Sequence, residues 1–123
     1  MRKGAVARLA GVALALLLPL IGAMPAAAQP HPNRTVRIFV PFPPGGPTDI
    51  TARLYAEQLT RRLGQQFIVE NRPGAGGVVA MNAVLSSPAD GYTLAFGTPS
   101  SQVLPDLTFH PRPYDSLRDF VAV

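Results

Sequence analysis

VRIFVPFPPGGPTDITARLYAEQLTRRLG, residues 36–64, joins an apolar run to a helical pattern through a loop rich in proline and glycine. We predict a strand over residues 35–40, because the pattern alternates and then becomes continuously apolar. Pro41 ends this strand, since it has no N–H to donate to a neighbour. We expect Thr48 or Asp49 to cap a helix at its N-terminus and Gly64 to cap it at its C-terminus. The stretch thus predicts a strand, a loop and a helix in succession.

The predicted helix has one apolar side. Steps of 100° per residue bring five of its side chains together as a core stripe. They are Ala52, Tyr55, Ala56, Leu59 and Leu63. Ile50 and Leu54 fall outside this stripe, which indicates that the helix has a second apolar neighbour.

The same succession recurs along the rest of the chain. QFIVEN at 66–71 predicts a second strand, RPGAGG at 72–77 a second glycine loop, and the following residues a helical face. After the turn PADGY, YTLAFG at 92–97 predicts a third strand, and TPSSQVLPDL a third loop with a short helical turn. Helical spans between strands are typical of βαβ units, so we predict an α/β fold with a parallel sheet.

Three loops, at 41–48, 71–77 and 97–101, follow the three predicted strands. Loops at the carboxyl ends of parallel strands share one edge of the sheet, so we expect them to converge. Gly45 and Gly46 allow a ligand to approach the backbone closely, and the next helix begins with unsatisfied N–H groups. The four prolines of the first loop restrict it before a ligand arrives. This combination suits a carboxylate or a phosphate, although a tight turn with a helix cap explains the first loop equally well when it is considered alone.

The N-terminus has the three-part layout of a secretory signal. Arg2, Lys3 and Arg8 form a basic region, residues 9–22 an apolar run, and residues 26–28 a small-residue cleavage site. We predict cleavage after Ala28, leaving a flexible Pro-rich lead-in at 29–34 on a secreted protein, which is compatible with a bacterial periplasm. A retained membrane anchor is disfavoured, because the run is shorter than the roughly 20 residues that span a bilayer.

Removal of this segment changes the charge of the protein. It carries three of the 11 Lys and Arg residues and none of the seven Asp and Glu residues. Eight basic and seven acidic residues remain, a net charge of +1, so nucleic-acid binding loses its main support. The sequence has no Cys, which excludes both a disulfide framework and a lipid anchor on Cys.

Enzyme signatures are weak or missing. GAGGVVA at 74–80 supplies two glycines of a dinucleotide fingerprint, but its third position is Val79. The only Lys is Lys3, so a Walker A loop cannot form. His31 and His110 have no second metal ligand at suitable spacing, and no serine lies in a nucleophile motif. We therefore predict no catalytic residue, no metal site and no cofactor.

Four segments together resemble a known family. VPFPPGGPTDITAR, VENRPGAGG, SPADGYTLAFGTPS and PYDSLRDF, in this order after a signal peptide, are similar to the periplasmic substrate-binding proteins of tripartite tricarboxylate transporters, the Bug family. The resemblance implies a two-lobed, hinged binding protein that delivers a small carboxylated solute to membrane transporter subunits. Residues 35–123 then correspond to part of the first lobe.

The resemblance also implies a ligand site between loops at the strand ends. Backbone and hydroxyl groups there hold the solute carboxylate, partly through water. Carried over, the site residues are Gly45, Gly46, Thr48, Gly97, Thr98, Ser100 and Ser101. Secondary candidates are Pro44, Asp49, Asn71 and Arg72: Asp49 either stabilises the helix start or binds a ligand amino group, Asn71 shapes the second loop, and Arg72 meets a carboxylate or is a surface residue.

LRDFVAV, at 117–123, is apolar at its end, as though a strand were beginning. We interpret the sequence as the first part of a longer solute-binding protein. Two alternatives remain open from the sequence: a nucleotide-binding half-domain of an enzyme, and a truncated product without function.

Overall fold

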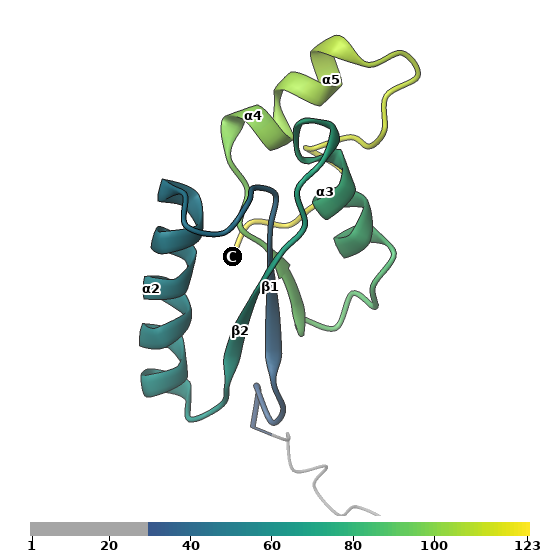
Figure 1. Cartoon of the computed structure of the whole chain (residues 1–123). Coiled ribbons are helices and arrows are strands. Elements are labelled where there is room, and N and C mark those ends of the chain that lie inside the picture. Colours follow the sequence, from purple (N-terminus) through teal and green to yellow (C-terminus); the bar gives the residue numbers. More distant parts are fainter. Residues whose placement is uncertain (1–29) are drawn as a thin grey trace, which may run out of the picture.

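The computed structural model describes residues 30–123, with a three-stranded parallel sheet at the centre (Figure 1). The strands are β1 (Val36–Val40), β2 (Phe67–Asn71) and β3 (Thr93–Ala95), in the order β2-β1-β3. Ile38 of β1 lies beside Val69 on one side and Leu94 on the other. The predicted α/β fold with a parallel sheet is therefore confirmed.

The central strand is buried on both faces. Val36, Ile38, Phe39 and Val40 are all buried, and only Arg37 is exposed. A parallel strand covered on both sides needs such a continuous apolar run. This explains why the first strand was visible in the sequence.

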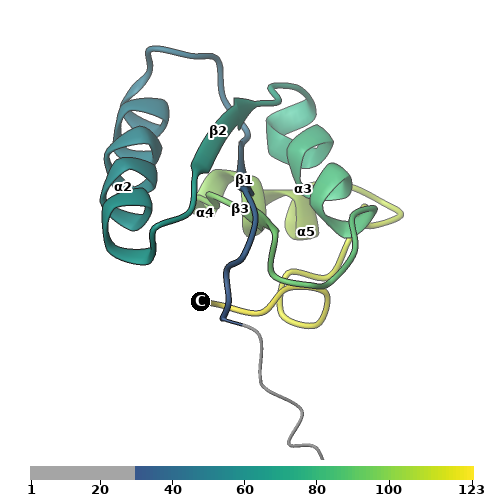
Figure 2. The same ribbon diagram turned by 90° about the horizontal axis from the view of Figure 1, so that it is seen from below.

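Helices cover the two faces of the sheet. α2 (Pro47–Leu63) lies on one face and α3 (Val78–Leu85) on the other, as the two views show (Figures 1 and 2). Because β2 and β3 flank β1 on opposite sides, crossovers of the same hand place their helices on opposite faces. Ala52 and Ala56 of α2 are buried, and their small side chains allow the helix to lie close to the sheet.

The larger core cluster lies on the α3 face. Phe39, Ala80, Met81 and Tyr114 are buried together there, and Phe120 packs edge-on against the Tyr114 ring with centroids 5.6 Å apart. Three short helices complete the fold: η2 (Ala75–Gly77) before α3, and α4 (Pro99–Gln102) and α5 (Leu104–Thr108) after β3. Tyr114 lies in the segment that follows α5. The C-terminal segment thus returns to the sheet and closes the core.

Three local expectations were wrong. α2 starts at Pro47, with Gly46 and not Thr48 or Asp49 as its N-cap, because proline suits the first helical position, where no N–H is needed. Tyr55 and Leu63 are 59% and 47% exposed, since the close approach of two alanines leaves the larger side chains at the border of the contact. β3 covers only Thr93–Ala95 of the predicted strand at 92–97.

Other local expectations are confirmed. Gly64 ends α2 in the left-handed conformation, with φ of 69°, and donates its N–H to the Thr60 carbonyl at 3.0 Å. Ile50 and Leu54 are exposed, so nothing among residues 30–123 covers them, and the second apolar neighbour that we expected for this helix stays a prediction. Within residues 30–123 no helix is long and apolar enough to cross a membrane. The predicted signal segment and its cleavage site lie outside the described residues.

Candidate functional site

The loops after the three strands meet at the carboxyl edge of the sheet, with Gly77 at the point of contact. A Cβ atom on Gly77 would lie 2.4 Å from the Cβ of Ser101 and 3.2 Å from the Cβ of Pro41. Gly77 also has φ of 102°, which side chains rarely adopt. Only glycine therefore permits this approach of the three loops, and the expected convergence is confirmed.

The direction in which successive strands are added to the sheet reverses after β2. β2 lies on one side of β1 and β3 on the other, so the loops after β1 and β3 leave from a topological switch point. Ligands of open α/β sheets bind in the crevice at such a point. Two groups of candidate residues occupy it: residues 44–48 after β1 and residues 97–101 after β3.

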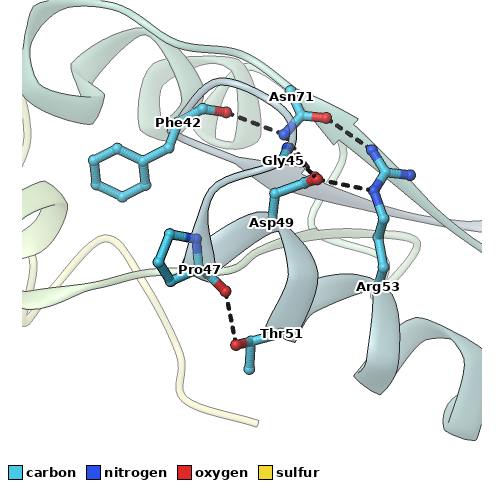
Figure 3. A network of polar contacts seen from close by, with 7 residues as sticks. All are labelled: Phe42, Gly45, Pro47, Asp49, Thr51, Arg53 and Asn71. Carbon is cyan, nitrogen blue, oxygen red and sulfur yellow. Dashed lines mark hydrogen bonds and ion pairs between the residues drawn. The ribbon is translucent and has the colours of Figure 1, made fainter.

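The first loop is fixed by the buried carboxylate of Asp49 in the first turn of α2 (Figure 3). Its Oδ2 accepts hydrogen bonds from the Gly45 N–H at 2.9 Å and from Arg53 Nε at 3.1 Å. Its Oδ1 accepts one from Asn71 Nδ2 at 2.8 Å. Asn71 also donates to the Phe42 carbonyl at 3.0 Å, so both ends of the loop are tied to the network.

These bonds stabilise the charged form of Asp49. The hydrogen bond from Arg53 contributes most, followed by those from Gly45 and Asn71, and together they lower the pKa of Asp49 to about 2. The side chain is only 4% exposed. Its negative charge is thus compensated inside the fold, which removes much of its repulsion toward an anion at the neighbouring loop.

The third loop is ordered by a capping box at the start of α4. Thr98 N–H donates to Ser101 Oγ at 3.0 Å, and Ser101 N–H donates to Thr98 Oγ1 at 3.3 Å. Ser101 is fully buried, so its hydroxyl faces the protein and not the solvent. Ser100 is exposed, and its hydroxyl lies 2.9 Å from Thr98 Oγ1.

The C-terminal segment supports this loop from behind. The hydroxyl of Tyr114 donates to the Ser101 carbonyl, and the hydroxyl of Ser116 donates to the Gln102 carbonyl. The Pro-rich sequence around Tyr114 gave no sign of this role. Arg53 was also missed, although its i,i+4 spacing from Asp49 on the helix is a usable signal.

The remaining candidates lie around the same edge. Pro44 and Gly45 are exposed, Gly46 and Thr48 are half-buried, and Gly97 is exposed beside the Gln102 side chain. The Arg72 guanidinium lies over the Phe39 ring, 4.2 Å from its centroid, and forms an ion pair with Glu70 at 3.2 Å. Arg72 is therefore engaged with the sheet face and does not extend freely from the second loop.

The clearest hollows of the described residues lie elsewhere. One, of about 320 Å³, is lined by Arg34, Arg37, Asp90 and Tyr92 near the amino ends of β1 and β3. Another of about 320 Å³ lies between α2 and β2. Neither is lined by a candidate residue of the first or third loop.

Comparison with known proteins identifies the family. A family model described as the tripartite tricarboxylate transporter family receptor, TctC, matches residues 51–123. The chain belongs to this receptor family. Its relatives are transporter solute-binding proteins and not enzymes, and the resemblance found in the four sequence segments is confirmed.

Curated relatives of the TctC receptor extend the match to the first loop. BugT of Bordetella pertussis is 45% identical over 102 residues, which cover 82% of this chain and 31% of that protein. A UPF0065 protein of Pseudomonas sp. strain P51 is 40% identical over 116 residues, covering 94% of this chain and 33% of that protein. The chain thus spans about a third of the length of these relatives.

Solved structures support the same fold. A structure described as a periplasmic transporter is 40% identical, with a TM-score of 0.67 over 72% of this chain and 30% of its own. MatC of Rhodopseudomonas palustris, solved with bound malate, is 37% identical, with a TM-score of 0.58 over the same shares. An R. palustris protein solved with adipate is 48% identical, with a TM-score of 0.55 over 56% of this chain and 23% of its own.

Proposed function

We propose that this chain supplies part of the solute site of a periplasmic receptor for a small carboxylate. The observation that carries the proposal is the start of α2 at the switch point: Gly46 is its N-cap, Pro47 follows, and no side chain caps the helix. The N–H groups of Gly46 and Thr48 at the start of the helix, together with the positive end of the helix dipole, suit a carboxylate.

The loop after β3 supplies hydroxyl groups to the same crevice. Ser100 is the exposed donor, and Thr98 lies beside it. Gly97 leaves room for the Gln102 side chain, whose Nε2 would lie 2.4 Å from a Cβ at this position, so in this proposal Gly97 reaches the solute only on the side that Gln102 leaves open. Ser101 orders the loop in this proposal and does not contact the solute, because its hydroxyl is committed to the Thr98 N–H.

The ligands of two relatives support a dicarboxylate as the solute. One was solved with malate and another with adipate, and both of these ligands are dicarboxylates. A dicarboxylate also suits a site with uncharged donors on one side, since its second carboxylate is free to meet another part of the receptor. We extend the proposal to delivery of the solute to membrane subunits of a tripartite tricarboxylate transporter, after export to the periplasm and cleavage behind Ala28. In this arrangement residues 29–34 are a lead-in and residues 35–123 belong to the first of two lobes.

Isothermal titration calorimetry tests the proposal. The complete product of the reading frame is titrated with malate, adipate and ATP. We expect micromolar binding of at least one dicarboxylate and no binding of ATP. Tight ATP binding without dicarboxylate binding would overturn the proposal in favour of a nucleotide-binding half-domain.

A pair of serine variants locates the site. Ser100→Ala removes the exposed hydroxyl beside Thr98 and should weaken dicarboxylate binding about fivefold to tenfold, the effect of one lost hydrogen bond of about 1 to 1.4 kcal/mol. Ser86→Ala is the matched control, because the Ser86 hydroxyl is also exposed and bonds only the Asn82 carbonyl. Equal affinities of the two variants would show that Ser100 is not a solute contact.

A further inference from the structure

Asp49, Arg53 and Asn71 form a closed polar network beside the first loop (Figure 3). Arg53 donates from Nε to Asp49 at 3.1 Å and from Nη2 to the Asn71 side-chain oxygen at 3.0 Å. Asn71 in turn donates to Asp49 at 2.8 Å. Asp49 and Arg53 lie on α2, whereas Asn71 is the last residue of β2. The network therefore joins a helix to the end of the neighbouring strand.

Two hydrogen bonds of this network hold the two ends of the loop after β1. Asn71 holds the Phe42 carbonyl near the start of the loop, and Asp49 holds the Gly45 N–H near its end. Gly45 has φ of 86°, a conformation that glycine adopts at little cost. Its orientation in the folded protein is therefore set by the bond to Asp49.

The polar atoms of the network are already committed to the protein. Asp49 uses both carboxylate oxygens, and the Asn71 amide uses both its oxygen and its nitrogen. A solute would have to break these bonds to reach the two side chains. They are thus poorly placed to bind the solute and well placed to shape the loop that does.

We propose that Arg53 and Asn71, acting through Asp49, are positioning residues for the solute site. They hold residues 42–45 so that the Gly46 and Thr48 N–H groups stay aimed at the carboxylate; this step rests on the proposed function. Arg53 also balances the negative charge of Asp49 next to the site. Loss of Arg53 both loosens the loop and leaves an uncompensated carboxylate close to an anionic ligand.

Amide hydrogen exchange, followed by NMR in the absence of a solute, tests the network directly. Arg53→Gln and Asn71→Ala are compared with the parent protein, all as the complete product of the reading frame. We expect exchange of the Gly45 amide to accelerate at least tenfold in both variants, while the β1 amides keep their protection. Arg61→Gln is the matched control, since Arg61 lies on the same helix and forms an exposed ion pair with Glu57 at 2.9 Å.

The affinity for malate and adipate provides a second readout. Arg53→Gln and Asn71→Ala should weaken binding at least tenfold, and Arg61→Gln should stay within twofold of the parent. Arg53→Lys keeps the charge, but its single ammonium group cannot reproduce the two-armed contact of the guanidinium. We expect this variant to restore part of the affinity and part of the Gly45 protection.

The outcomes separate this inference from the proposed function. A parent protein that binds neither acid would refute the proposed function, while the exchange experiment would still decide whether the network holds the loop. Unchanged Gly45 exchange in both variants would overturn the inference. Acceleration shared equally by the β1 amides would overturn it too, because the residues would then stabilise the whole fold and not the loop. Weaker binding with unchanged Gly45 exchange would show direct contact with the solute.

Discussion

Replacement of Gly77 by alanine is the strongest perturbation that the structure offers at the loop edge. The added methyl group would lie 2.4 Å from the Cβ and 3.1 Å from the Cα of Ser101, so the backbone of α4 has to move. Overpacking of this kind lowers the free energy of unfolding by about 1 to 3 kcal/mol. The backbone at φ of 102° adds strain of about 1 to 3 kcal/mol.

The expected loss of stability for Gly77→Ala is therefore about 2 to 6 kcal/mol. Gly76→Ala is the matched control, because Gly76 has φ of 65° and a methyl group added to it would meet nothing within 4 Å. Its cost should be only the left-handed strain of about 1 to 2 kcal/mol. The difference between the two variants measures the contact of the second loop with Ser101 and Pro41.

Urea denaturation followed by circular dichroism measures both variants. With a slope of about 1 to 3 kcal/mol per molar urea, the overpacking cost of about 1 to 3 kcal/mol should lower the midpoint of Gly77→Ala by about 0.3 to 3 M beyond that of Gly76→Ala. Dicarboxylate affinity should also fall only in the Gly77 variant, since the methyl group pushes the third loop away from the first. Equal midpoints for the two variants would refute the reasoning that Gly77 is the contact point of the loops.

Three further predictions concern the groups around the site. The pKa of Asp49 is lowered from 3.8 to about 2 on folding, so the stability that its ionised form contributes should be lost as pH falls from about 4 to about 2. Asp49→Asn should remove this contribution, and urea midpoints at several pH values should therefore fall less steeply with pH in the variant than in the parent. Ser101→Ala should destabilise the protein by about 1 kcal/mol through loss of the capping box, and an unchanged midpoint would argue against that box. Tyr114→Phe should cost about 1 kcal/mol by leaving the Ser101 carbonyl without its donor, with thermal denaturation as the measurement.

The fold was predictable from the sequence where the local residue pattern reflects the tertiary environment of the segment. β1 is apolar because both of its faces are covered, and Gly64 caps α2 because its left-handed conformation favours glycine. The start of α2 was misplaced, because Thr48 and Asp49 are better capping residues by type than Gly46. Asp49 instead uses its carboxylate to hold Gly45 and Asn71, which lies 22 residues further along the chain.

The geometry of the candidate site was predictable only at the level of its loops. Glycine and proline marked the loops after the strands, but the burial of Ser101 depends on Gly77, a distant residue without a side chain. The support of the third loop by Tyr114 likewise comes from a segment with no helical or strand periodicity. Contacts of this kind arise from the packing of the whole chain, and no local pattern encodes them.

The central claim is that the loops after β1 and β3 bind the carboxylate. Titration of the isotope-labelled complete product of the reading frame with malate and adipate, followed by amide chemical shifts, tests it most directly. We predict that the largest shifts occur at Gly46, Thr48 and Thr98. Largest shifts at Arg34 and Tyr92, which line the hollow near the opposite edge of the sheet, would contradict the account.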